Sequence, residues 1–100
     1  MTSMNKPIAH AQSYAIHYLD NGGKATEFPT RHKDLYQAIQ LEEKRRLAVS
    51  IRYKMMENKS FKKKINMKFK VSPQTELQPE DLYDLLDKLS NKQLFSMLHS

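Results

Sequence analysis

The amino-acid sequence predicts a mainly α-helical fold with one short β element, built as a single small domain over residues 1–100. Two patterns support this fold class. Apolar residues recur every three to four positions along most of the chain, which is typical of helices that bury one face. In one short segment they alternate with polar residues, which is typical of a strand. The segments expected to be helical, three to four in number, are about 6–20, 30–58, 79–89 and 91–98.

The first expected helix, about residues 6–20, ends at a strong stop signal. Ala11 and Ala15 lie four positions apart on its apolar face, and Gly22 and Gly23 follow its last turn. Glycine readily adopts the left-handed backbone conformation that helix C-termini use. We therefore expect a sharp break before the loop that leads to the second helix.

The second expected helix, about residues 30–58, carries an apolar seam with alternating four- and three-residue spacing. Glu42 and Arg46 interrupt this seam four positions apart, where opposite charges on a helix can pair. A helix of this length exceeds what a small domain needs, so we expect it to protrude or to pack against a second protomer. The seam residues assigned to an interface are Leu35, Ile39, Val49 and Tyr53.

Residues 64–71 are expected to form the strand, because apolar and polar residues alternate along them. A lone strand leaves backbone N–H and C=O groups unpaired, so it requires a neighbour. That neighbour could be an extended piece near residues 25–28, a second copy of the chain or a partner protein. The apolar strand residues assigned to the interface are Ile65, Met67, Phe69 and Val71.

The last two expected helices, about 79–89 and 91–98, follow a connector that contains Pro73. Pro79 suits a first helical turn, and Glu80 and Asp81 place negative charge at the positive end of the helix dipole. Apolar residues at helical spacing follow in both segments. We therefore expect two short amphipathic helices here.

Charge is segregated along the chain, although the net total is only +6. Residues 31–72 carry thirteen Lys and Arg against four acids, and residues 73–100 carry a net charge of −3. Clustered cations attract polyanions, and they are the electrostatic footprint of phosphate binding. The residues assigned to a nucleic-acid-binding site are Arg45, Arg52, Lys62, Lys63, Lys64, Asn66, Lys68 and Lys70.

The composition argues against an enzyme and favours a cytoplasmic protein. The chain has no cysteine, which excludes disulfides and thiolate metal sites, and no apolar run is long enough to span a membrane. The four histidines lack the spacing that places two imidazoles on one helical face. Nothing in the pattern of carboxylates indicates an acid–base pair. We therefore expect no catalytic site, no cofactor and no metal.

These features predict a small regulatory protein that binds nucleic acid, DNA in preference to RNA, as a homodimer. Two copies of residues 64–71, paired antiparallel, would place their apolar side chains in one core. The outward face of the resulting two-stranded ribbon, a shape that the major groove of DNA admits, would then carry Lys64, Asn66, Lys68 and Lys70.

The order of one strand and two helices over residues 64–100 resembles the ribbon-helix-helix DNA-binding architecture. The resemblance lies in the order of the elements, and no specific motif supports it. It implies that the start of the last helix, with Ser90, Asn91 and Lys92, contacts a phosphate. The connector over residues 73–78 is longer than in that architecture, and the last helix is shorter.

An alternative from a different class is a protein–protein adaptor or inhibitor. The long helix would dock on a partner helix, or residues 64–71 would extend a partner sheet. The basic patch would then meet an acidic partner surface and speed the encounter. The salt dependence of binding distinguishes the two predicted functions, because phosphate binding weakens steeply as the salt concentration rises.

Overall fold

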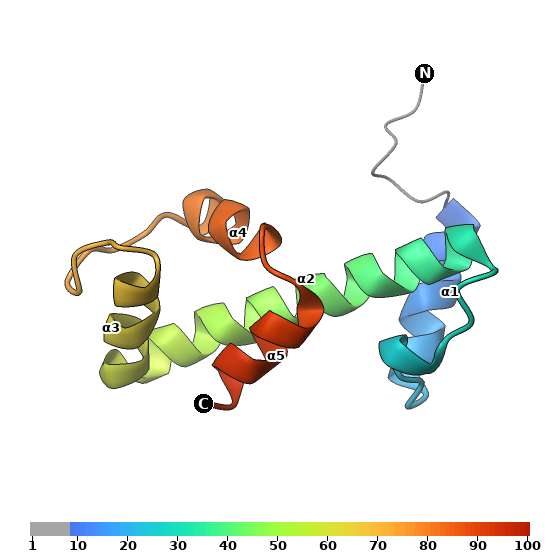
Figure 1. Cartoon of the computed structure of the whole chain (residues 1–100), viewed down its shortest axis with the longest axis horizontal. Helices are drawn as coiled ribbons and strands as arrows, with labels where there is room; N and C mark the ends of the chain where they lie inside the picture. The colour runs from blue at the N-terminus through green and yellow to red at the C-terminus, as the bar shows by residue number, and fades with distance from the viewer. Residues whose placement is uncertain (1–8) are drawn as a thin grey trace, which may run out of the picture. The chain divides into compact units, whose positions relative to one another are not determined.

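The structure, a computed structural model, describes residues 9–100, which fold into five α-helices and one short 3-10 helix (Figure 1). No strand occurs between residues 9 and 100. The mainly α-helical class is therefore confirmed, but the predicted β element is wrong and the helices outnumber the three to four predicted. The elements are α1 (Ala9–Asp20), the 3-10 helix η1 (Ala25–Glu27), α2 (Lys33–Glu57), α3 (Lys59–Lys68), α4 (Pro79–Asp87) and α5 (Asn91–Leu98).

Four of these helices lie close to the boundaries that the sequence predicts. α2 begins at Lys33 rather than 30 and ends at Glu57 rather than 58, while α4 ends at Asp87 rather than 89. α5 matches its prediction, and α1 ends at residue 20 as expected. Residues 6–8 of the first predicted helix lie outside the described part of the chain.

The chain divides into two compact units, Met1–Arg45 and Arg46–Ser100, here called the N-terminal and the C-terminal unit. α2 contributes residues to both units. Each unit has its own hydrophobic cluster among the described residues.

Small side chains dominate the core of the N-terminal unit. Most of its buried apolar residues are alanines, whose short side chains let helix backbones approach closely. η1 is tied to α2 by a hydrogen bond of 2.8 Å from Nε2 of Gln40 to the carbonyl oxygen of Ala25. The buried residues of this cluster are Ala11, Ala15, Ala25, Phe28, Ala38 and Ile39.

Gly22 and Gly23 end α1 as the sequence predicts, each for its own physical reason. Gly22 has a φ of +88°, in the left-handed region that favours glycine. The N–H groups of Gly22 and Gly23 donate to the carbonyls of Leu19 (3.1 Å) and Tyr18 (2.9 Å), the two bonds of a Schellman motif. Gly23 also lies against the ring of Tyr18, and a Cβ at this position would come within 2.5 Å of that ring.

Larger apolar side chains build the core of the C-terminal unit. Leu86 of α4 and Leu94 of α5 are fully buried. α5 begins with a capping box, in which Oγ of Ser90 accepts from the Gln93 N–H (3.1 Å) and Oε1 of Gln93 accepts from the Ser90 N–H (2.8 Å). The buried residues of this cluster are Leu47, Ala48, Ile51, Met55, Phe61, Ile65, Leu82, Leu86, Leu94 and Met97.

The predicted strand at residues 64–71 is instead the second half of α3 and the turn that follows it. Phe61 and Ile65, four positions apart, are 4% and 3% exposed, whereas Met67 is 63% exposed. The buried face therefore has helical rather than period-two spacing. A helix pairs its own backbone N–H and C=O groups, so this segment needs no neighbouring strand. The resemblance to the ribbon-helix-helix architecture fails for the same reason, because the segment that would form the ribbon is helical.

Two asparagine side chains secure α3 at its start and after its end. Oδ1 of Asn58 accepts a hydrogen bond of 3.0 Å from the N–H of Phe61 and so caps the first turn. Asn66 is fully buried, although the strand pattern placed it on a solvated face. Its side-chain Nδ2 donates to three carbonyl oxygens of the following loop, those of Ser72 (3.3 Å), Pro73 (3.2 Å) and Thr75 (3.0 Å).

α3 ends in a Schellman motif that has lysine where α1 has glycine. Lys70 has a φ of +61°, which a non-glycine residue rarely adopts. Its N–H donates to the carbonyl of Met67 (3.0 Å), and the N–H of Val71 donates to that of Asn66 (2.8 Å). The chain therefore turns away from the helix axis at residues 69–71, whereas the predicted strand would have continued in one direction to residue 71.

Candidate nucleic-acid interface

Four lysines form the solvent-facing side of α3. Lys59 and Lys63 are four positions apart, as are Lys64 and Lys68, so the two pairs form adjacent rows on the helix. All four are exposed, and the equally exposed Met67 lies on the same side. We call the four lysines the basic face of α3. α3 itself contains no acidic residue.

The cations of the basic face differ from their neighbours in having no acidic partner within residues 9–100. Lys62, on the buried side of the same helix, forms an ion pair with Glu76. Lys54 of α2 lies 4.5 Å from the centroid of the Phe61 ring and donates to the carbonyl of Leu98 at 2.6 Å. Lys62 and Lys54 therefore make contacts within the C-terminal unit, whereas the lysines of the basic face point to solvent.

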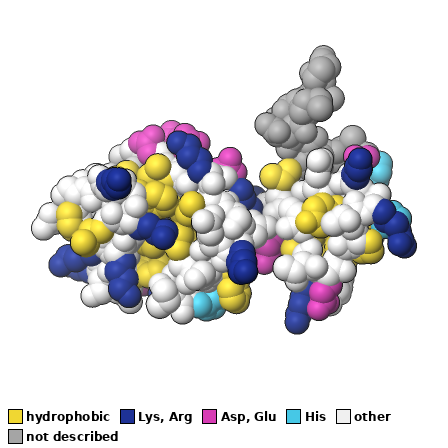
Figure 2. Space-filling model, viewed as in Figure 1, with side chains coloured by type: hydrophobic (Ala, Val, Ile, Leu, Met, Phe, Trp, Pro, Cys, Tyr) yellow, Lys and Arg dark blue, Asp and Glu magenta, His cyan; other side chains and the backbone are white. Residues whose placement is uncertain are grey.

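Charge is also divided between the helices of the C-terminal unit. This unit carries eleven Lys and Arg against six acids, a net charge of +5, whereas the N-terminal unit carries +1. Figure 2 shows Lys and Arg side chains over α3 and Asp and Glu side chains over α4. The acids of α4, which are exposed, are Glu80, Asp81, Asp84 and Asp87. A polyanion is therefore attracted to the α3 side of the unit rather than to its α4 side.

The residues assigned to nucleic-acid binding from sequence do not all lie on this face. Lys63, Lys64 and Lys68 belong to it, and the exposed Lys70 lies in the turn directly after it. Asn66 is fully buried, so it presents no surface to a ligand. Lys62 is engaged with Glu76, as described above. Lys59 was not assigned from sequence, although its four-residue spacing from Lys63 is a signal that could have found it.

Two assigned arginines also contact other side chains of the protein. Nη2 of Arg45 lies 2.6 Å from Oε2 of Glu42, a buried carboxylate of the N-terminal unit. Nη1 of Arg52 lies 3.5 Å from the hydroxyl oxygen of Tyr83 in the C-terminal unit. Neither guanidinium belongs to the basic face of α3.

The residues assigned to an interface divide between the interior and the surface. Ile39 is buried in the N-terminal unit and Ile65 in the C-terminal unit, so both serve the folded chain itself. Tyr53 and Met67 are exposed and are free to contact a partner. The remaining four are partly buried: Leu35, Val49, Phe69 and Val71.

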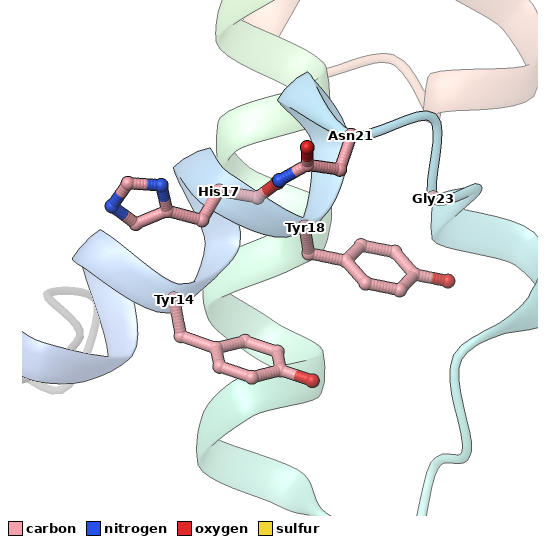
Figure 3. A pocket seen from close by; sticks show the side chains of 5 residues that line it. All are labelled: Tyr14, His17, Tyr18, Asn21 and Gly23. Carbon is pink, nitrogen blue, oxygen red and sulfur yellow. The ribbon is translucent and has the colours of Figure 1, made fainter.

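The N-terminal unit has a shallow aromatic pocket of about 340 Å³ (Figure 3). The rings of Tyr14 and Tyr18 project to the same side with centroids 6.3 Å apart and planes at 12°, and His17 points away from them. The hydroxyl of Tyr18 donates to the carbonyl of Lys24 at 2.9 Å, and Nδ2 of Asn21 donates to the carbonyl of His17 at 2.8 Å. These polar groups serve the end of α1, so they do not converge on a ligand.

The C-terminal unit has a larger groove of about 410 Å³, here called the methionine groove. It lies where α2 ends, α3 begins and the chain enters α4. Hydrophobic side chains, flanked by Lys and Arg, are visible at the surface of this unit in Figure 2. The lining residues are Arg52, Met55, Met56, Lys59, Lys62, Glu76, Leu77, Pro79 and Leu82.

Within residues 9–100, His, Asp and Glu form no group of three that could hold a metal ion. No helix in this part of the chain is both long enough and apolar enough to cross a membrane. No family model, curated protein or solved structure matches the chain. The candidate site therefore depends on geometry and charge alone.

Proposed function

We propose that this protein binds nucleic acid, DNA in preference to RNA, through the basic face of α3. The observation that carries the proposal is the set of four lysines on the solvent-exposed half of a helix, without an acidic partner in the described residues. A helix of ten residues is about 15 Å long, and the major groove of DNA is about 12 Å wide and admits a helix. The major groove of double-stranded RNA is deep and narrow by comparison. This difference favours DNA.

The mode of contact differs from the ribbon that the sequence pattern suggested. A helix, rather than a pair of strands, now carries the cations, and a single copy of the chain presents all of them. The predicted strand pairing has no basis in the described residues, which contain no strand, so a homodimer stays a prediction that depends on the length of α2. Sedimentation equilibrium of the protein alone measures its oligomeric state directly.

The chemistry of the basic face favours phosphate contacts over base readout. Bidentate recognition of bases uses Arg, Asn or Gln side chains, and the exposed side of α3 offers only lysines with Ser60 and Met67. Lysine ammonium groups act as point charges on the phosphate backbone. We therefore expect binding with little dependence on base sequence.

Fluorescence anisotropy with a labelled DNA duplex tests the proposal. Four phosphate contacts predict that log K falls with log salt concentration with a slope of about −3.6. Replacing the basic face by glutamine (Lys59→Gln, Lys63→Gln, Lys64→Gln, Lys68→Gln) should abolish most of the binding and flatten this slope.

A matched control variant removes the same charge elsewhere. Lys24, Lys33, Lys88 and Lys92 are exposed and lie outside α3, so their replacement by glutamine tests whether net charge alone explains binding. This control should retain most of the affinity. Equal losses in the two variants, or binding that does not respond to salt, would contradict the assigned face.

A further inference from the structure

The methionine groove leaves an apolar side chain in solvent beside a cationic rim. Met56 lines the groove and is 67% exposed, whereas its neighbour Met55 is 8% exposed and forms part of the core. Methionine is flexible and polarizable, so the part of the lining formed by Met55 and Met56 can adapt to apolar ligands of different shape. The remaining apolar lining is Leu77, Pro79 and Leu82.

The charges around the groove are unequal. Among the described residues it is lined by three cations and one acid, Glu76. Glu76 forms an ion pair with Lys62, so Arg52 and Lys59 have no carboxylate partner in this part of the chain. A ligand that brings a carboxylate into this rim therefore gains favourable electrostatic interactions.

The chain itself contains a short example of the chemistry that fits the groove. Glu76 pairs with Lys62, and the next residue, Leu77, places its side chain in the lining. A carboxylate bound to a groove lysine and a large apolar side chain thus already lie next to each other at this surface. Among the described residues, none that lines the groove has an aromatic ring on which a nucleobase could stack, so the groove is poorly suited to single-stranded nucleic acid.

From these observations we infer that the methionine groove binds a short acidic segment of a partner protein. One large apolar side chain of the segment lies on Met55 and Met56, and neighbouring carboxylates bind Arg52 and Lys59. A volume of about 410 Å³ accommodates such a side chain with its flanking backbone. This site is separate from the proposed DNA contact, with Lys59 alone belonging to both.

Methionine methyl NMR tests the inference, because the methionines of the chain lie in different places. The probe is the acetylated peptide Glu-Asp-Leu-Phe-Glu-Asp-Leu-Glu, titrated into protein with ¹³C-labelled methionine methyl groups. We expect the Met55 and Met56 signals to shift, while those of Met67 on α3 and Met97 in the core stay in place. A peptide with Ala in place of Leu and Phe should cause no such shift. Absence of shifts with the first peptide, or shifts at Met67 alone, would overturn the inference.

Two other occupants are tested in the same experiment. Decanoate offers an apolar chain with a carboxylate, and oligo(dT) offers bases with phosphates. Shifts of Met55 and Met56 with either of these, but not with the acidic peptide, would show that the groove serves another ligand. Duplex DNA should shift Met67 and not Met56, so a failure of the DNA proposal is distinguishable from a failure of this one.

A pair of charge-matched variants completes the test. Met56→Glu places a carboxylate in the groove and should weaken peptide binding by about tenfold or more, because it repels the acidic ligand. Met67→Glu adds the same charge at an equally exposed position outside the groove and should have a small effect. Both side chains are largely solvent-exposed, so both variants are expected to fold. Equal peptide affinities for the two variants would contradict the assignment of the groove as the peptide-binding site.

Discussion

The ends of α1 and α3 share the same pair of backbone hydrogen bonds, yet the residue with positive φ is Gly22 in one and Lys70 in the other. At α1, glycine meets the conformational requirement without a steric cost. At α3, lysine adopts the left-handed conformation at a cost of about 1 kcal/mol. The loop beyond α3 is tied to the helix by Asn66, whose side chain reaches three carbonyl groups. Tertiary contacts can thus enforce a turn that local sequence does not favour.

The two units also differ in how they are packed. The N-terminal core consists mainly of alanines, which have little side chain to lose on truncation, whereas the C-terminal core contains large aliphatic and aromatic residues. Large buried side chains contribute more apolar area per residue. Mutations should therefore have their largest effects in the C-terminal unit.

The largest expected effect is at the centre of the C-terminal core. Leu86→Ala should reduce the free energy of unfolding by about 3 kcal/mol, because a fully buried leucine leaves a cavity. Urea denaturation followed by circular dichroism measures the change. Leu41→Ala, at an exposed position of α2, is the control and should cost much less. Similar losses in the free energy of unfolding for the two variants would mean that burial of the leucine does not determine its contribution to stability.

The next effect concerns the asparagine that holds the loop after α3. Asn66→Leu keeps the number and branching of the side-chain heavy atoms but removes the donor to the carbonyls of residues 72, 73 and 75, and it should cost about 2 kcal/mol. Amide hydrogen exchange should show the N–H of Val71 losing protection more than the N–H groups of α5. An unchanged unfolding midpoint would argue that solvent replaces these bonds at no cost.

A smaller loss is expected at the end of α1. Gly23→Ala brings a Cβ within 2.5 Å of the Tyr18 ring, so the ring must move, at a cost of about 1.5 kcal/mol. The displaced ring should change the near-ultraviolet circular dichroism of the tyrosines. Ser13→Ala, at an exposed helical position, provides a neutral comparison. Retention of both the wild-type spectrum and stability would contradict the close contact.

The smallest effect has the opposite sign and tests the comparison of helix ends directly. Lys70→Gly should raise the free energy of unfolding by about 0.5 to 1 kcal/mol, because glycine adopts a φ of +61° without strain. Lys64→Gly removes the same charge inside the helix and should lower stability by a similar amount. Thermal denaturation of the two variants distinguishes them. A destabilised Lys70→Gly variant would show that the lysine side chain contributes more than its backbone conformation costs.

Much of the helical architecture is predictable from local signals. Gly22 stops α1, Pro79 starts α4, and Ser90 caps α5, each by a mechanism confined to a few neighbouring residues. Part of the candidate site is predictable as well, since Lys63, Lys64 and Lys68 were assigned from charge alone. Lys59 was missed and Asn66 was placed on the surface, because both assignments depended on the wrong secondary structure.

The sequence by itself determined the helical class, the positions of most helix ends and the concentration of positive charge near residues 59–70. The tertiary structure alone decided that this segment is helical. Its apolar residues fit both the period of a strand, with Ile65 and Met67 two positions apart, and that of a helix, with Phe61 and Ile65 four positions apart. Burial of Phe61, Ile65 and Asn66 selects the helical period, since a helix pairs its own backbone groups while a strand requires a partner. The same packing turns the lysines of α3 outward, and so it creates the surface to which we assign nucleic-acid binding.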